Sequence, residues 1–175
     1  MNWLTFISLQ VCFSDDFWKS LAKIKRTEIN KEVLRLLEKL SSGWRSPNNE
    51  KIPNAITGTC SELFQQYKVN GLLDLVWTTD IFKENSNCTQ VLKVWDILPR
   101  SETSKLARRL ETLLGNYTVN DMNRCKVKCI EGNLEVPMRW PGNMNDTGKS
   151  LLLGDDPGEL LSRSIASLRI WDESD

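Results

Sequence analysis

Three runs in the middle of the chain constrain its fold more than any other feature. Residues 63–69, 72–82 and 89–98 are rich in valine, isoleucine, threonine and aromatic side chains, a composition that favours β-strands. The first two runs are separated by Asn70-Gly71, the preferred pair for a tight hairpin. The sequence therefore predicts a three-stranded antiparallel meander. Apolar residues occupy both alternating sets of positions in the third run, which predicts a central strand covered on both faces.

Helical periodicity precedes and follows this meander. Before it, a first helix is predicted from Ser14, which is available as an N-cap, and a second from Thr27, which can cap it, to Gly43. The two helices are joined tightly and should form a helical hairpin. After the meander, one helix is predicted from Ser101 to Gly115 and a shorter one from Thr118 to about Gly132.

The predicted fold class is α+β, with an N-terminal helical hairpin, a three-stranded antiparallel meander and two C-terminal helices. At 175 residues the chain has the length of one domain. We expect an atypical N-terminal segment at 1–13, an α+β accessory domain at 14–140 and a flexible acidic tail at 141–175. The tail is expected because periodicity is lost there and Gly, Pro, Asp and Ser accumulate.

The composition limits which chemistry the chain can perform. Lysine plus arginine equals aspartate plus glutamate at 23 each, so a charged partner must be met by a local patch. Histidine is absent, which excludes Ser/His and Cys/His nucleophilic pairs and imidazole metal ligation. Five cysteines without Cys-x-x-Cys spacing are typical of reduced thiols inside a cell. Cys125 and Cys129, four apart on a predicted helix, could share a metal, but core packing is the interpretation we favour; no metal and no cofactor is predicted.

One stretch carries letters of a nucleotide-binding P-loop. Gly148-Lys149-Ser150 matches the end of that motif, but Gly142 is one residue too far upstream. Two prolines stand where the preceding strand should be, and the following residues break after a single turn. We interpret the match as a coincidence in the tail.

The start of the chain leaves a secreted protein open as an alternative. Residues 1–14 are apolar, and Asn87, Asn116 and Asn145 begin glycosylation sequons. Against secretion, no basic residue precedes the apolar stretch and no small-x-small cleavage pattern follows it. No run reaches the ~18 apolar residues that a membrane-spanning helix needs, so no membrane partner is predicted.

Two kinds of site were considered on the predicted domain. Paired carboxylates for acid-base chemistry would have to come from acids on the predicted strands, and strand-end or exposed acids are the plainer interpretation of Asp74, Asp80 and Asp96. Basic residues interleaved with aromatic ones could bind RNA, although Trp77 and Trp95 are expected in the core. The candidate RNA contacts are Lys19, Lys23, Lys25, Arg26, Lys68, Lys93 and Arg100.

Two blocks of the chain resemble a known group of proteins. The segments "VLKVWDILP" at 91–99 and "KLARRLETLLGNYTVNDMNRCKVKCIEGNLEVPMRWP" at 105–141 are similar to a region of plant Sen-type (senataxin-like) superfamily-one helicases. Related segments occur in plant relatives of the tetratricopeptide-and-ankyrin-repeat helicase-like proteins. The segments at 14–45 and 70–81 fit the same region in the same order, so the resemblance covers about three quarters of the chain.

The resemblance implies a position after the helicase motor, at the C-terminal end of those large proteins. In the family, Walker motifs and arginines of the upstream lobes bind and hydrolyse ATP, and no stretch of this chain matches them. No catalytic residue is therefore carried over, and this chain alone is not expected to be an enzyme. Residues 1–10 depart from the family pattern, which suggests a truncated paralogue or a fragment of a longer helicase-like protein.

The leading hypothesis is a non-catalytic accessory domain of a plant helicase-like protein of the P-loop NTPase group, acting in RNA processing. Its expected partners are a protein, such as the upstream helicase lobes, or weakly held RNA; no small-molecule substrate is predicted. The resemblance implies a nuclear location, with the cytoplasm as the alternative. A second hypothesis comes from the order of elements, which resembles the RelE/ParE-like toxins and would make the chain an RNA-binding or RNA-cleaving domain. A small secreted glycoprotein is the third.

Overall fold

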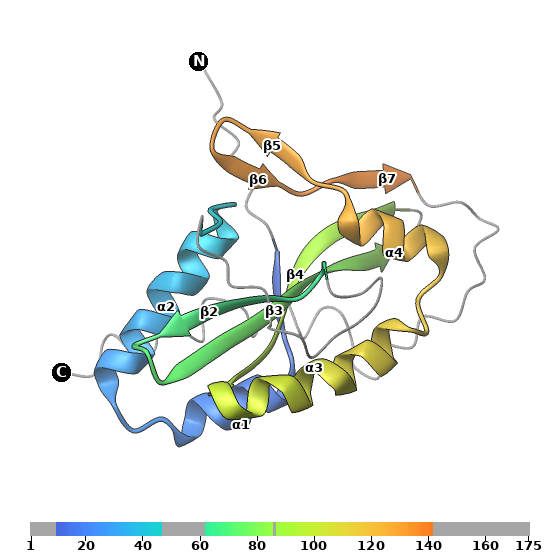
Figure 1. The fold of residues 1–175 in the computed structure, drawn as a ribbon. Coiled ribbons are helices and arrows are strands. Elements are labelled where there is room, and N and C mark those ends of the chain that lie inside the picture. The colour runs from blue at the N-terminus through green and yellow to red at the C-terminus, as the bar shows by residue number, and fades with distance from the viewer. Residues whose placement is uncertain (1–9, 47–61, 86, 142–175) are drawn as a thin grey trace, which may run out of the picture.

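The computed structural model describes residues 10–46, 62–85 and 87–141 of the chain. These residues form an α+β fold, as the sequence predicts (Figure 1). The elements in chain order are β1 (Val11–Phe13), α1 (Asp15–Lys23), α2 (Thr27–Ser41), β2 (Gln65–Val69), β3 (Leu73–Glu84), β4 (Asn87–Pro99), α3 (Arg100–Leu114), α4 (Val119–Lys126), β5 (Cys129–Glu131), β6 (Leu134–Val136) and β7 (Arg139–Pro141).

The predicted meander is confirmed. Strand β2 pairs antiparallel with the first part of β3, and β3 pairs antiparallel with β4 along its whole length. Asn70 and Gly71, at the β2–β3 turn, both have positive φ angles, of 48° and 79°. Glycine and asparagine adopt this backbone region more readily than other residues, which is why the pair indicates a tight hairpin.

The other edge of β4 is shared by two short strands from opposite ends of the described chain. Val11–Phe13 of β1 pairs in parallel with Leu92–Val94, and β7 pairs antiparallel with Asn87–Thr89. The sheet is therefore mixed, in the order β1-β4-β3-β2 with β7 beside β1 on β4. Strand β1 falls within the segment 1–13 that the sequence sets apart from the domain. Of the expected tail at 141–175, all but Pro141 lies outside the described residues.

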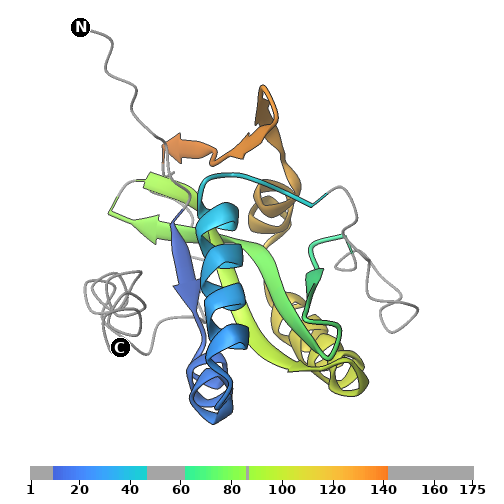
Figure 2. The ribbon, with the colours of Figure 1, turned by 90° about the vertical axis from the view of Figure 1, so that its left-hand side faces the viewer.

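Helices cover both faces of the sheet (Figure 2). One hydrophobic cluster joins α1 and α2 to the sheet around Phe17, Val33 and Trp77. The second cluster joins α3 and α4 to the opposite face around Trp95, Leu110 and Cys125. Trp77 and Trp95 are both buried, as predicted, and they belong to different clusters. Strands β3 and β4 thus contribute to two cores at once.

A β-bulge explains the irregular apolar pattern of β4. Val76 is opposite Asp96 and Trp77 is opposite Val94, so Trp95 is the extra residue on the longer strand. The indole Nε1 of Trp95 donates a hydrogen bond of 2.9 Å to the Thr78 hydroxyl. Because a bulge shifts the alternation by one residue, apolar side chains on one face of β4 need not keep a period of two.

Helices were predicted to start at Ser14, Thr27, Ser101 and Thr118, and two of these side chains cap their helix whereas two do not. The Ser14 hydroxyl accepts from the Phe17 backbone N–H and also donates to the Trp95 carbonyl, and the Thr118 hydroxyl caps α4. Thr27 instead lies inside α2, whose N-cap is Arg26 without a side-chain cap. Ser101 lies inside α3, which begins directly after Pro99. The fixed φ of proline already suits a helix entry, so the N-cap of α3 is Pro99, two residues before the serine.

The last predicted helix is too long. Helix α4 ends at Lys126, and Cys129 lies on strand β5 rather than one helical turn beyond Cys125. A hairpin replaces the expected last turns, because Gly132 takes a positive φ of 63° and places Leu134 opposite Glu131. The possible two-cysteine site on a single helix is therefore excluded by the backbone.

The end of α2 touches this hairpin closely. Gly43 has a φ of +90°, and its carbonyl accepts a 2.8 Å hydrogen bond from the Glu135 backbone N–H. A Cβ atom at Gly43 would lie 2.4 Å from the Glu135 carbonyl oxygen. A residue without a side chain is therefore required both by the backbone angle and by the contact with β6.

Candidate functional site

Four of the candidate RNA contacts are exposed and lie within residues 19–26. Lys19 and Lys23 lie on α1, and Lys25 and Arg26 lie in the junction between α1 and α2. Lys19 is paired with Asp16 at 3.7 Å. For the other three cations, no carboxylate lies within ion-pair distance among the residues that the structure describes. The junction therefore presents three unpaired positive charges within four residues.

The backbone of this junction is held in place by hydrogen bonds. The Asn30 side chain donates to the Ile24 carbonyl at 3.3 Å, and the Ile29 N–H donates to the Arg26 carbonyl at 3.1 Å. Ile24 itself packs against the α1–α2 core. Because the backbone is fixed, the cationic side chains start from a defined arrangement instead of from a free loop.

The remaining candidates lie on other elements. Lys68 is exposed on the outer strand β2, and Arg100 is exposed at the start of α3. Both are close to the β2–β3 hairpin, since Val69 pairs with Leu73 and Leu73 with Pro99. Lys93 is half-buried on β4, with its Nζ 5.3 Å from the centre of the Trp95 ring. The seven predicted cations therefore do not form one cluster.

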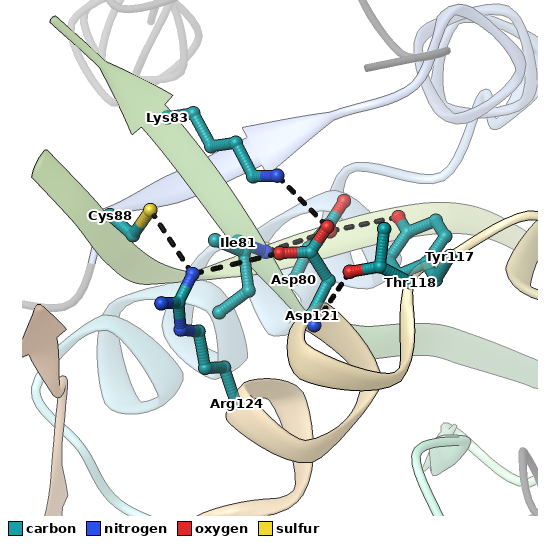
Figure 3. Close-up of polar contacts among 8 residues, drawn as sticks. All are labelled: Asp80, Ile81, Lys83, Cys88, Tyr117, Thr118, Asp121 and Arg124. Carbon is teal, nitrogen blue, oxygen red and sulfur yellow. Dashed lines mark hydrogen bonds and ion pairs between the residues drawn. The ribbon is translucent and has the colours of Figure 1, made fainter. Parts of the chain in front are cut away.

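The three strand aspartates have different surroundings. Asp74 is buried, and one of its carboxylate oxygens lies 3.5 Å from the Thr103 hydroxyl of α3. Asp96 accepts a 2.8 Å hydrogen bond from the Ile97 backbone N–H. Asp80 lies in a partly buried ionic cluster whose other acid, Asp121 of α4, was not among the predicted residues (Figure 3).

The Asp80 carboxyl is the most enclosed group of this cluster. Its side chain accepts hydrogen bonds from the Tyr117 hydroxyl at 2.8 Å and from the Ile81 backbone N–H at 2.7 Å. Burial raises the pKa of Asp80 above its ordinary value, and the hydrogen bond from Tyr117 opposes this rise. Burial and the nearby Asp80 charge also raise the pKa of Tyr117. The tyrosine therefore stays protonated and donates.

Asp121 is a second acid near Asp80, and it pairs with the cations of the cluster. Lys83 Nζ lies 2.9 Å from one Asp121 oxygen, and Arg124 lies 3.8 Å from the other. Arg124 also donates to the Cys88 sulfur at 3.5 Å, and its guanidinium lies 5.7 Å from the centre of the Trp140 ring. Figure 3 shows Lys83 of β3, Cys88 of β4, and Asp121 and Arg124 of α4 reaching toward one another.

A buried glutamine completes the attachment of α4. The Gln90 amide nitrogen donates to the carbonyls of Arg124 and Val127 at 2.7 and 2.8 Å. Its oxygen accepts from the Met138 N–H at 2.9 Å. The amide thus satisfies backbone groups at the end of α4 and just before β7. Together with the ionic cluster, Gln90 fixes α4 and β7 to β4.

The ionic cluster holds α4 in place on the sheet and is not a catalytic site in this geometry. Asp80 is only 6% exposed, so its carboxyl is closed to a substrate. The interpretation of Asp80 as a strand-end or exposed acid is wrong, because Asp80 lies in the interior of β3 and is buried. No sequence pattern indicated its partner Tyr117, because the two residues are 37 positions apart. The only local signal was Thr118, which caps the helix that carries Asp121.

The other motifs give no further site on the described residues. Cys12, Cys88, Cys125 and Cys129 are free thiols, and no group of three or more potential metal ligands occurs in the described ranges. Asn87 and Asn116, two of the sequon asparagines, are exposed. Asn145 and the Gly148-Lys149-Ser150 stretch lie outside the described residues.

Comparison with known proteins adds no relative. No protein-family model, curated protein sequence or solved structure matches this chain. Within the described helices, none combines the length and apolar character that crossing a membrane requires. The functional argument therefore depends on the residues themselves.

Proposed function

We propose that this chain is a non-catalytic accessory domain that contacts RNA through the α1–α2 junction. The observation that carries the proposal is the group formed by Lys23, Lys25 and Arg26. All three side chains are exposed, and within the described structure none is neutralised by a carboxylate. Unpaired cations on an ordered backbone are the groups that bind phosphates of a nucleic acid without reading its sequence.

The wider setting of the proposal comes from the sequence resemblance. A Sen-type helicase-like protein acting in RNA processing in the nucleus would hold RNA in its motor lobes, and an accessory domain beside them would add phosphate contacts. A protein contact with those lobes is the other part of this proposal. Transcript reads that run upstream of the Met1 codon into helicase-coding sequence would support a fragment of a larger helicase-like protein, whereas a mapped transcription start and a matching native N-terminal peptide would contradict it.

The RNA contact is tested by removing the three charges together. We expect Lys23→Gln, Lys25→Gln and Arg26→Gln in one variant to weaken binding of a fluorescein-labelled twelve-nucleotide oligouridylate by on the order of tenfold. The slope of log affinity against log salt should fall by about 2, since each phosphate contact on a single strand contributes ~0.7. Fluorescence anisotropy at several salt concentrations measures both quantities.

A matched control removes the same charge elsewhere. Lys105, Arg108 and Arg109 are exposed cations on α3, and two of them already pair with Glu102 and Asp16. Their triple glutamine variant should bind the oligonucleotide like the unmodified chain. Equal weakening in the two variants would mean that only net charge matters, and the proposed site would be wrong.

RNA cleavage is the second candidate, because Lys93 lies against the Trp95 ring on the sheet. The order of two helices, a meander and a following helix is the support for a RelE/ParE-like architecture, in whose ribonuclease branch basic and aromatic residues of the sheet act on RNA. The expected helical hairpin itself is wrong, because α1 packs on β4 and α2 on β2, and the two helices do not lie side by side (Figure 1). The purified chain should then cut RNA, and Lys93→Gln or Arg100→Gln should abolish the activity. Cleavage that persists in both variants, or no cleavage at all, contradicts this candidate.

A further inference from the structure

A cleft lies beside the outer edge of β3. Strand β2 covers β3 only from Leu73 to Trp77, and the C-terminal end of α4 packs farther along the strand. Between them, the end of α2 and the residues before β2 enclose a cleft with a volume of about 420 Å³. This volume lies in the range of small-molecule binding sites, ~300–1,000 Å³. It exceeds the space needed for a bare inorganic anion.

The charged side chains of this edge cleft are predominantly basic. Arg45, Lys126 and Lys128 line it, together with the carboxylates of Glu62 and Glu135. Lys126 pairs with Glu62 at 3.6 Å, and Arg45 Nε lies 3.4 Å from Glu135. Lys128 is exposed and has no carboxylate within ion-pair distance among the described residues. The five groups together carry a net charge of +1.

The guanidinium of Arg45 is fixed in place. Its Nη1 donates to the carbonyls of Leu40 and Trp44, at 3.1 and 2.8 Å. Its Nη2 is buried and has no hydrogen-bond partner among the described residues. Burial lowers the pKa of Arg45, and Glu135 opposes this effect. Because Nη2 is closed to solvent and the other guanidinium nitrogens already have partners, Arg45 contributes a fixed positive charge to the wall of the cleft.

We propose that the edge cleft binds the phosphomonoester of a nucleotide-sized molecule. A phosphomonoester carries about −1.5 to −2 charges at pH 7 and three acceptor oxygens, which suit a fixed arginine beside an unpaired lysine. The Thr79 side chain also lines the cleft and offers a hydroxyl group to the rest of the molecule. A free nucleotide and the phosphorylated end of an RNA strand share this chemistry. The inference is independent of the RNA contact at the α1–α2 junction.

The first test titrates the chain with uridine monophosphate, and with uridine as the uncharged control. We expect saturable binding of the monophosphate by calorimetry, and a loss of about tenfold or more in Lys128→Gln, because that variant removes a charge-assisted contact. Lys105→Gln removes an equally exposed lysine from α3 and should bind normally. Both substitutions are at the surface, so the variants should fold, as circular dichroism can verify.

A substitution with the opposite effect sharpens this test. Glu62 is 68% exposed and pairs with Lys126, so Glu62→Gln frees a cation and removes a repulsive charge from the cleft. This variant should bind uridine monophosphate severalfold more tightly. Equal affinity for uridine and its monophosphate, or equal losses in Lys128→Gln and Lys105→Gln, would overturn the inference.

The two sources of the phosphomonoester are separated with hexauridylate. If the cleft accepts RNA ends, the 5′-phosphorylated form should bind more tightly than the 5′-hydroxyl form, and Lys128→Gln should abolish the difference. Monophosphate binding without any oligonucleotide binding supports the cleft and contradicts the proposed RNA function. Oligonucleotide binding that ignores the terminal phosphate, with no monophosphate binding, supports the RNA function and contradicts the cleft.

Discussion

At the scale of single residues, Asp80 shows how a buried charge is made tolerable. The carboxyl is almost fully enclosed, and the donors from Tyr117 and Ile81 are what the fold provides in place of water. Burial outweighs these hydrogen bonds, so the pKa of Asp80 is raised in the folded state. The folded state then binds this proton more tightly than the unfolded chain. The contribution of Asp80 is therefore most favourable below the unfolded-state pKa, about 4, and is lost as pH rises through the folded-state pKa.

Asp80→Asn tests whether the contribution of Asp80 to stability falls as the pH rises. The amide oxygen can still accept from Tyr117 and Ile81, but no charge is buried, so the variant should be more stable than the unmodified chain at pH 7. The advantage should shrink as the pH falls through the folded-state pKa and be smallest below about 4, where the carboxyl is protonated in both states. Tyr117→Phe is the contrasting variant and should lose roughly 1–3 kcal/mol at pH 7, because the carboxylate loses a donor. Urea unfolding at several pH values measures both; a constant difference for Asp80→Asn across this range would contradict the account.

Only part of the candidate site could be predicted from the sequence. Lys23, Lys25 and Arg26 could be proposed from the sequence because neighbours in the chain stay neighbours on a short helix and its junction. The link between Asp80 and Asp121, and the edge cleft that brings Arg45 to Lys128, are made by tertiary packing. No local pattern states which strand a helix will cross, so these partners appear only in the folded structure.

At the scale of elements, local signals predicted the helices and the meander, and nonlocal pairing decided the rest. The Asn70-Gly71 turn and the periodic apolar faces act within a few residues. The β2–β3 hairpin and the four helices that they predicted are present in the structure. Strands β1 and β7 have three residues each and exist through their pairing with β4. The four-residue spacing of Cys125 and Cys129 predicted a helix that continues to about Gly132. The chain instead forms a β-hairpin there, with Gly132 at a positive φ in the turn.

Substitution of Gly43 tests the contact between the residues after α2 and strand β6. Gly43→Ala forces a side chain into the left-handed region and against the Glu135 carbonyl, 2.4 Å from the new Cβ. Gly71→Ala is the matched control, because it has a similar φ but nothing lies within 4 Å of its Cβ. Backbone strain alone should cost the control roughly 1–3 kcal/mol. Gly43→Ala should cost more and should accelerate amide exchange in β5 and β6; equal losses in thermal unfolding would show that the contact with Glu135 is unimportant.

At the scale of the whole molecule, the two hydrophobic clusters depend on the same two strands. Trp77 of β3 and Val94 of β4 belong to the α1–α2 side, whereas Val76 and Trp95, their neighbours in sequence, belong to the α3–α4 side. A strand cannot lose its packing on one face and keep its position on the other. The described domain should therefore unfold as one cooperative unit.

Leu110→Ala provides the test of this cooperativity. Leu110 of α3 is fully buried against the sheet, and its truncation should cost about 2–5 kcal/mol. Because the sheet is shared, the most protected amides of α2, on the opposite face, should lose the same free energy of exchange as those of α3. Leu113→Ala, on the same helix but 41% exposed, should leave both sets nearly unchanged. Faster exchange confined to α3 and α4 in Leu110→Ala would show that the two layers unfold independently, and hydrogen exchange with mass spectrometry separates these outcomes.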